Sequence, residues 1–194
     1  MNGEWTHDFL ENLVRNLVAE KNRPLLFEPV HHNTKWHEFS LMRHNALVVE
    51  AAQRMLVLTG VDVMTAALFH DLGKLVQFDN AVATGDYFFA GHEQFSVELA
   101  QKYGISGHVL HAIQYHDISY QHRADRILPK LCGGDVGMLR HLLAIAACDT
   151  AGKGWTDAQR VQRLKVAEKF HHVCEMAELD DSFADVIKQA CLEW

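Results

Sequence analysis

The stretch Ala66-Ala67-Leu68-Phe69-His70-Asp71-Leu72-Gly73-Lys74 decides the fold that we predict for this chain. Small and apolar residues lead into an adjacent histidine and aspartate, and a buried helix rarely carries such an ionisable pair without a partner. Candidate partners recur along the chain at His44, His92, His116 and Asp149. Each of them lies in a segment whose apolar residues repeat at helical spacing. The pattern therefore predicts a metal centre built inside a bundle of helices.

The rest of the chain also has helical periodicity, and no segment alternates between apolar and polar residues as a strand does. We expect a single all-α domain of the helical-bundle type over residues 1–194, with a metal-site core at about 35–155 and further helices at about 156–194. The expected helices span about 7–20, 39–59, 63–72, 92–103, 106–116, 137–151 and 156–179, with a last one after 180.

Helix ends and loops follow from the same pattern. Thr6 and Ser106 are expected to cap helices, Gly60 to end one, and Gly73 to stop the helix that carries His70. The expected loops span about 24–36, 78–90 and 121–134.

The composition is ordinary for a soluble globular protein, with 48% hydrophobic and 22% charged residues. The formal net charge of −7 argues against binding along a nucleic-acid backbone, which needs a basic stripe. The four cysteines show no C-x-x-C spacing, which favours reduced thiols over a zinc site or a disulfide framework. The first residues lack a signal-peptide pattern, and Gly60 and Asp62 interrupt the longest apolar run. We therefore expect a cytoplasmic protein without a membrane-spanning helix and without a long nucleic-acid partner.

The candidate ligands are imidazoles and carboxylates, which suit borderline divalent transition metals such as Mn, Co, Ni, Fe or Zn. One ion would take two nitrogens and two oxygens from His44, His70, Asp71 and Asp149. Asp71 could bridge to a second ion held by His92 together with His116, or with His111 or His122 in its place. Two ions roughly 3.5–4 Å apart can share and deprotonate a water and clamp a phosphoryl group.

Cationic residues near the candidate ligands point toward phosphate. Lys74 follows Asp71 by three residues, Lys153 follows Asp149 by four, and Arg43 adjoins His44. We expect these three to hold a substrate phosphate, with Asp71 and Lys74 acting in catalysis. His37 and His122 are further candidates for substrate contact, and His31, His32 and His37 for the mouth of the cleft.

Together these residues resemble the motifs of the HD superfamily of metal-dependent phosphohydrolases. The similar stretches are K-W-H-E at 35–38 before His44, the stretch at 66–74, G-H-E at 91–93, Y-H at 115–116, and L-L-A-I-A-A-C-D-T-A-G-K-G at 142–154. Within the superfamily, the chain is most similar to the HD domain of bacterial CCA-adding tRNA nucleotidyltransferases, here as a stand-alone domain. Its T-A-G-K at 150–153 departs from an A-R-G-R-like ending in those proteins.

The resemblance implies an HD-type helical fold and the hydrolysis of phosphomonoesters or phosphodiesters, including 2′,3′-cyclic nucleotides and 2′-nucleotides. It gives metal-ligand roles to His44, His70, Asp71 and Asp149, and a phosphate-contacting or acid role to Lys74. His92 and His116 would complete a second metal position, so that one or two ions are bound. The expected partner is a small phosphate ester, and the chain could form a homodimer.

Two other functions use the same residues. Some HD-like proteins use six such ligands for a di-iron centre that oxidises an organophosphonate or a polyol. A non-catalytic nucleotide-binding module is the second alternative, although buried ionisable groups without a use are costly.

Overall fold

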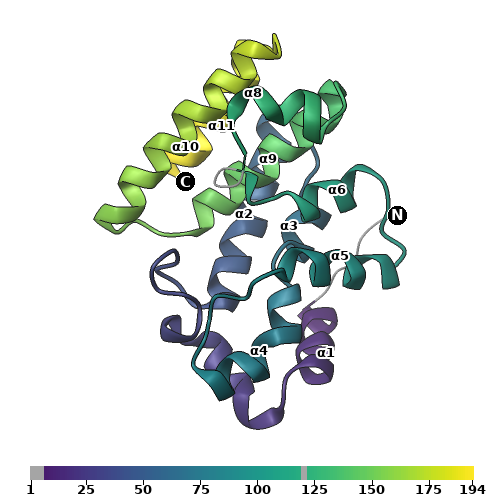
Figure 1. Ribbon diagram of the computed structural model, residues 1–194, viewed down its shortest axis with the longest axis vertical. Helices are drawn as coiled ribbons and strands as arrows, with labels where there is room; N and C mark the ends of the chain where they lie inside the picture. Colours follow the sequence, from purple (N-terminus) through teal and green to yellow (C-terminus); the bar gives the residue numbers. More distant parts are fainter. Residues whose placement is uncertain (1–6, 119–121) are drawn as a thin grey trace.

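A computed structural model describes residues 7–118 and 122–194 of the chain (Figure 1). Within these residues every regular element is helical and no strand is present, which confirms the predicted all-α class. The α-helices are α1 (His7–Leu17), α2 (Leu41–Thr59), α3 (Met64–Phe69), α4 (Gly73–Thr84), α5 (His92–Lys102), α6 (His108–Gln114), α8 (Ala124–Arg126), α9 (Val136–Gly152), α10 (Asp157–Met176) and α11 (Asp181–Glu193). The other turns are η1 (Glu20–Phe27) and η2 (Pro29–His31), of 3-10 geometry, and η3 (Ile127–Leu131), of π geometry.

Helices α2 and α9 form the centre of the fold. In Figure 1, α2 runs through the middle of the molecule, and it packs along α9 and against α3 and α11. The apolar run of α9 is buried without interruption from Leu142 to Gly152, as expected for a helix that is apolar on all sides. Ser40 caps the start of α2 by accepting a hydrogen bond from the Arg43 backbone N–H, and Gly60 ends the helix in the left-handed conformation.

The C-terminal helices α10 and α11 pack on each other and cover α9. Thr156 and Gln159 form a capping box at the start of α10, and Asp180 caps α11. The buried Arg163 of α10 donates hydrogen bonds to the carbonyls of Ala151 and Cys191. Its guanidinium therefore ties the ends of α9 and α11 to α10.

Gly73 corrects one sequence prediction. It does not stop a helix but begins α4, and residues 78–84 of the expected loop are helical. The side-chain-free backbone of Gly73 packs against the start of α5, where a Cβ atom would lie 2.0 Å from the carbonyl oxygen of His92 and 2.7 Å from the Ser96 nitrogen. The glycine is needed for this close approach and not for a left-handed conformation.

Other boundaries also differ from the expectations. The first helix ends at Leu17, and the 3-10 turns η1 and η2 occupy most of the expected loop that follows. Helix α6 follows Gly107 and not a Ser106 cap, and it ends at Gln114, which leaves His116 in a turn. The expected loop at 121–134 contains α8 and η3. The predicted cap Thr6 lies outside the described residues.

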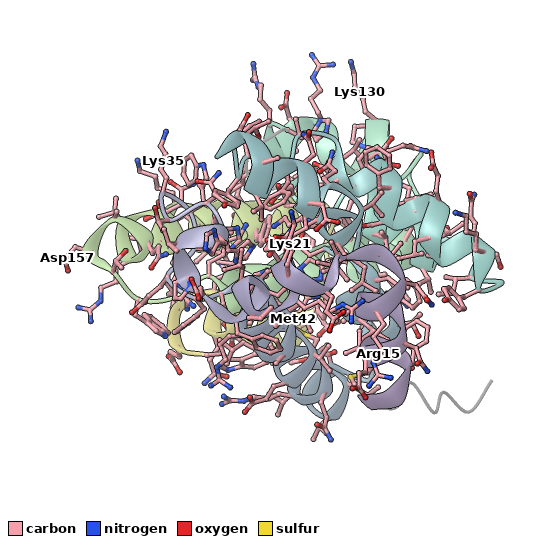
Figure 2. All side chains as sticks on the ribbon, turned by 90° about the horizontal axis from the view of Figure 1, so that it is seen from below. Arg15, Lys21, Lys35, Met42, Lys130 and Asp157 are labelled. Carbon is pink, nitrogen blue, oxygen red and sulfur yellow. The ribbon has the colours of Figure 1, made fainter. Side chains whose placement is uncertain are left out.

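Charged side chains such as Lys35, Lys130 and Asp157 project outward from the molecule (Figure 2). Among the described residues, no helix is both long enough and apolar enough to cross a membrane.

We predict that Gly73→Ala destabilises the fold, because the new methyl group would force α4 away from α5. The expected loss in the free energy of unfolding is at least about 1–3 kcal/mol, the usual cost of overpacking. The matched control is Gly137→Ala in the first turn of α9, where a Cβ would meet only the Asp135 side chain, at 3.2 Å. Urea unfolding of both variants tests this prediction, and equal stabilities would contradict it.

Candidate metal centre

Six buried side chains converge from five parts of the fold. His44 lies in the first turn of α2, Asp149 in the last turn of α9, and His92 begins α5. The pair His70-Asp71 forms the turn between α3 and α4, and His116 lies in the turn after α6. None of the six is more than 7% exposed. Most of these ligands thus lie at helix ends, where several segments can meet at one point.

The first group comprises His44, His70 and Asp149. The Nε2 atoms of the two histidines are 3.2 Å apart. The Asp149 Oδ1 atom lies 3.2 Å from His44 Nε2 and 3.7 Å from His70 Nε2. Three donor atoms thus surround one position that an ion could occupy.

The second group comprises Asp71, His92 and His116. Asp71 Oδ1 lies 3.0 Å from His92 Nε2 and 3.6 Å from His116 Nε2. Its other oxygen, Oδ2, faces the first group, at 3.3 Å from His44 Nε2 and 3.5 Å from His70 Nε2. The Asp71 carboxylate therefore stands between the groups and could bridge two ions.

Backbone carbonyls orient all four histidines. Each Nδ1 atom lies within hydrogen-bond distance of a carbonyl oxygen: His44 of Gly152 at 3.0 Å, His70 of Ala67 at 2.7 Å, His92 of Phe89 at 3.0 Å, and His116 of Ile113 at 2.7 Å. A carbonyl can only accept, so Nδ1 carries a proton in every ring. In the neutral rings the lone pair is then on Nε2, the atom that faces the centre, as in histidines that bind metals.

The donor set fits divalent transition-metal ions. Asp71 Oδ1 is buried and has no hydrogen-bond partner among the described residues. Burying such an oxygen beside imidazole lone pairs is costly unless a cation compensates it. Imidazole nitrogen and carboxylate oxygen together are the ligands that borderline divalent metals take.

Electrostatics keep the carboxylates charged. Although burial by itself raises the pKa of Asp71, the Lys74 ammonium 2.6 Å from its Oδ2 atom holds that pKa well below the usual range. Burial likewise opposes the charge of Asp149, but Lys153, 2.6 Å from Oδ2, lowers the pKa of Asp149. Two anionic ligands are thus available at neutral pH.

The histidines differ in their protonation. Burial lowers the pKa of His70 to about 3, so its ring is neutral. Burial also opposes charge on His116, but the neighbouring Asp71 carboxylate raises its pKa to about 9. A metal ion in the second group would therefore compete with a proton on His116.

His32 is a site residue that the sequence placed only at the cleft mouth. It is completely buried, and its Nδ1 lies 3.1 Å from the Phe39 carbonyl. Its Nε2 atom is therefore free to accept a hydrogen bond from Lys74 Nζ, 3.2 Å away. His37 stacks on the His32 ring with centroids 3.8 Å apart. The doublet His31-His32 was the available signal, but nothing in it distinguishes the buried ring from its neighbour.

A cavity of about 420 Å³ opens beside the cluster. His37, Lys74, His92 and Asp117 line its polar side, and Lys153 contacts Asp117 at 3.3 Å. Its apolar side is aromatic and contains Trp36, Tyr87, Phe88 and Phe89. A substrate in this cavity would reach both the candidate metal ligands and Lys74.

Three candidates lie outside the cluster. Arg43 is exposed on α2 and lines a separate pocket with Phe27 and Met42. The His122 ring packs on Tyr115 with centroids 6.3 Å apart. His111 Nε2 lies 2.7 Å from the carbonyl oxygen of Leu131. Of the alternatives for the second metal position, the structure thus brings His116 to Asp71 and His92.

The fold and the histidine–aspartate centre together place the protein in the class of all-α proteins with a candidate metal site of HD type. The family model of the HD domain matches residues 41–169, a span that contains all six candidate ligands. The chain therefore belongs to the HD domain family, whose members form a superfamily of metal-dependent phosphohydrolases. No solved structure matches the chain.

We predict that Asp71→Ala removes bound metal, because one carboxylate serves both groups. The metal content of the purified protein, measured by inductively coupled plasma mass spectrometry, is expected to fall at least about tenfold. Asp185→Ala on the exposed face of α11 is the matched control and should leave the metal content unchanged. An Asp71→Ala protein with the metal content of the wild type would contradict the assignment.

Proposed function

We propose that the protein hydrolyses a small phosphate ester, and that its substrate is a nucleotide such as a 2′,3′-cyclic nucleotide or a 2′-nucleotide. The observation that carries the proposal is the Asp71 carboxylate between two histidine pairs, with Lys74 beside it at the wall of an open cavity. Divalent ions held there would act as Lewis acids and activate water for attack on phosphorus.

Lys74 and Asp71 have different roles at the phosphoryl group. The Lys74 ammonium lines the cavity and can donate to a phosphoryl oxygen, which stabilises the charge that develops during hydrolysis. Asp71 stays anionic because Lys74 holds its pKa low, so it remains a ligand across the neutral range. Lys153, paired with Asp149 and Asp117, is the second cation that could approach a phosphate.

The aromatic side of the cavity supports a nucleotide as the substrate. Trp36 and Phe88 are both exposed there, and Tyr87 and Phe89 adjoin them. Nucleobases stack on such rings with a gain of about 1–3 kcal/mol per base. A nucleobase stacked on this wall would place the phosphate of its nucleotide toward Lys74 and His92.

The closer likeness to the HD domain of CCA-adding nucleotidyltransferases stays a prediction.

Hydrolysis assays test the proposal. Protein loaded with Mn, Co or Ni is expected to hydrolyse 2′,3′-cyclic AMP, 2′-AMP or bis-p-nitrophenyl phosphate. His70→Ala should lower kcat/KM more than about a thousandfold, whereas His172→Ala on the exposed face of α10 should not change it. Oxygen consumption with an iron-dependent spectrum, and no hydrolysis, would favour a di-iron oxygenase. A protein that binds nucleotides and hydrolyses none would be a binding module.

His32 is expected to act as a positioning residue for Lys74. His32→Phe keeps a ring against His37 but removes the acceptor for the Lys74 ammonium, and we predict a fall in kcat of about 10- to 100-fold at unchanged metal content. His32→Gln, which restores an acceptor, should recover part of that loss, and His108→Phe at an exposed position should have no effect. Equal kcat values for the Phe and Gln variants would rule out positioning through the hydrogen bond.

A further inference from the structure

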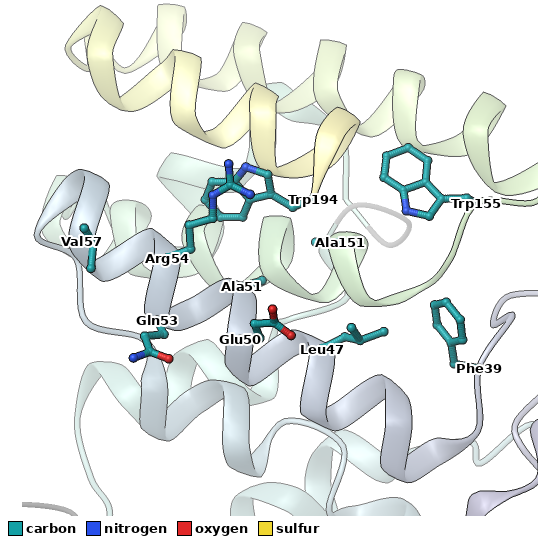
Figure 3. Close-up of a pocket in the computed structure, with 10 residues that line it drawn as sticks. All are labelled: Phe39, Leu47, Glu50, Ala51, Gln53, Arg54, Val57, Ala151, Trp155 and Trp194. Atoms are coloured by element: carbon teal, nitrogen blue, oxygen red, sulfur yellow. The ribbon is translucent and has the colours of Figure 1, made fainter.

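A second cavity, of about 520 Å³, lies on another part of the molecule (Figure 3). It is bordered by α2, by the loop between α9 and α10, and by the end of α11. Its aromatic walls are Phe39, Trp155 and Trp194. Among the residues that the structure describes, none lines both this cavity and the one beside the metal centre. The two cavities could therefore be occupied at the same time.

The aromatic walls are held in place by polar contacts. The Trp155 backbone N–H donates to Glu38 Oε2 at 2.6 Å. Gly154 precedes it with a φ of +109°, and a Cβ there would lie 2.4 Å from the Glu38 side chain. On the other side, Arg163 donates to the carbonyl oxygen of Trp194 at 3.3 Å. A ligand would thus meet walls that are already ordered, which lowers the entropic cost of binding.

Both indole rings already accept a cation from the protein. The Arg163 guanidinium lies 3.7 Å from the ring centroid of Trp155, and the Arg54 guanidinium lies 4.4 Å from that of Trp194. Such contacts reflect the negative potential of the ring faces. The rings of this cavity are thus suited to positive charge.

A carboxylate completes the arrangement. In Figure 3, Glu50 rises from α2 toward the space that Trp155 and Trp194 border. Among the described residues, no salt bridge of Glu50 is found, although Arg54 is four residues away on the same helix. The net charge of −7 also favours the approach of a cation over that of an anion.

We propose that this cavity, through its aromatic walls Phe39, Trp155 and Trp194 and the carboxylate of Glu50, binds a small organic cation of the quaternary or methylated ammonium class. Aromatic faces with one carboxylate are the arrangement that recognises such groups, because they are too weakly hydrated to prefer water strongly. The cavity is large enough for the ammonium group and for the molecule that carries it. Of the described residues that line the cavity, Arg54 alone carries a positive charge, so it competes with the ligand.

Isothermal titration of the full chain with choline tests the proposal, and 3,3-dimethyl-1-butanol, its neutral isostere, is the matched control ligand. Choline is expected to bind with a millimolar or lower Kd, at least about tenfold more tightly than the isostere. Equal binding of the two compounds, or no saturable binding of choline, would overturn the proposal.

Four variants locate the site and its charge preference. Glu50→Gln and Trp155→Ala should each weaken choline binding at least about tenfold, whereas Arg54→Gln should strengthen it because a competing cation is removed. Trp36→Ala, in the wall of the other cavity, should leave choline binding unchanged. Weaker binding in Arg54→Gln, or a loss in Trp36→Ala without one in Trp155→Ala, would also overturn the proposal. Glu50 is exposed on a helix, so its variant is expected to fold.

Discussion

The burial of one carboxylate, Asp71, constrains the rest of the molecule. A charge that is only 1% exposed needs compensation at both of its oxygens. Lys74 and one histidine pair face Oδ2, and a second pair faces Oδ1. These partners come from separate helices, so the helices must end around Asp71. The bundle is therefore arranged around a compensated charge as much as around its apolar core.

Close backbone approach makes this convergence possible. Gly73 lets α4 start against α5, and Gly152 lets the end of α9 lie against α2, where a Cβ would come within 2.9 Å of His44 Nδ1. The same Gly152 provides the carbonyl that accepts the proton of His44 Nδ1. Glycine at these two positions thus has a packing role that also orients the ligands. Both ends of the centre depend on backbone atoms that no side-chain pattern reveals.

The segment from Ala151 to Trp155 connects the two cavities. On one side it orients His44 and holds Lys153 beside Asp149, and on the other it forms a wall of the second, aromatic-lined cavity. Arg163 fixes the segment from behind by binding the Ala151 carbonyl and stacking on Trp155. An occupant of that cavity would therefore contact the same short segment that positions the metal ligands, which gives the two sites a physical connection.

The sequence by itself determined the all-α class and the candidate ligand residues, because helical periodicity and buried ionisable pairs are local signals. It also placed the end of α2 at Gly60. Only the tertiary structure decided that His32 lies beside Lys74. It also decided that Arg43 lines a separate pocket although its neighbour His44 is buried in the centre, because adjacent residues on a helix can face opposite environments. It likewise showed that Gly73 begins a helix, since close packing against α5 depends on a segment about twenty residues away. The neighbours of Lys74 and the packing of Gly73 depend on distances between helices. The pattern of residues along a single helix does not contain these distances.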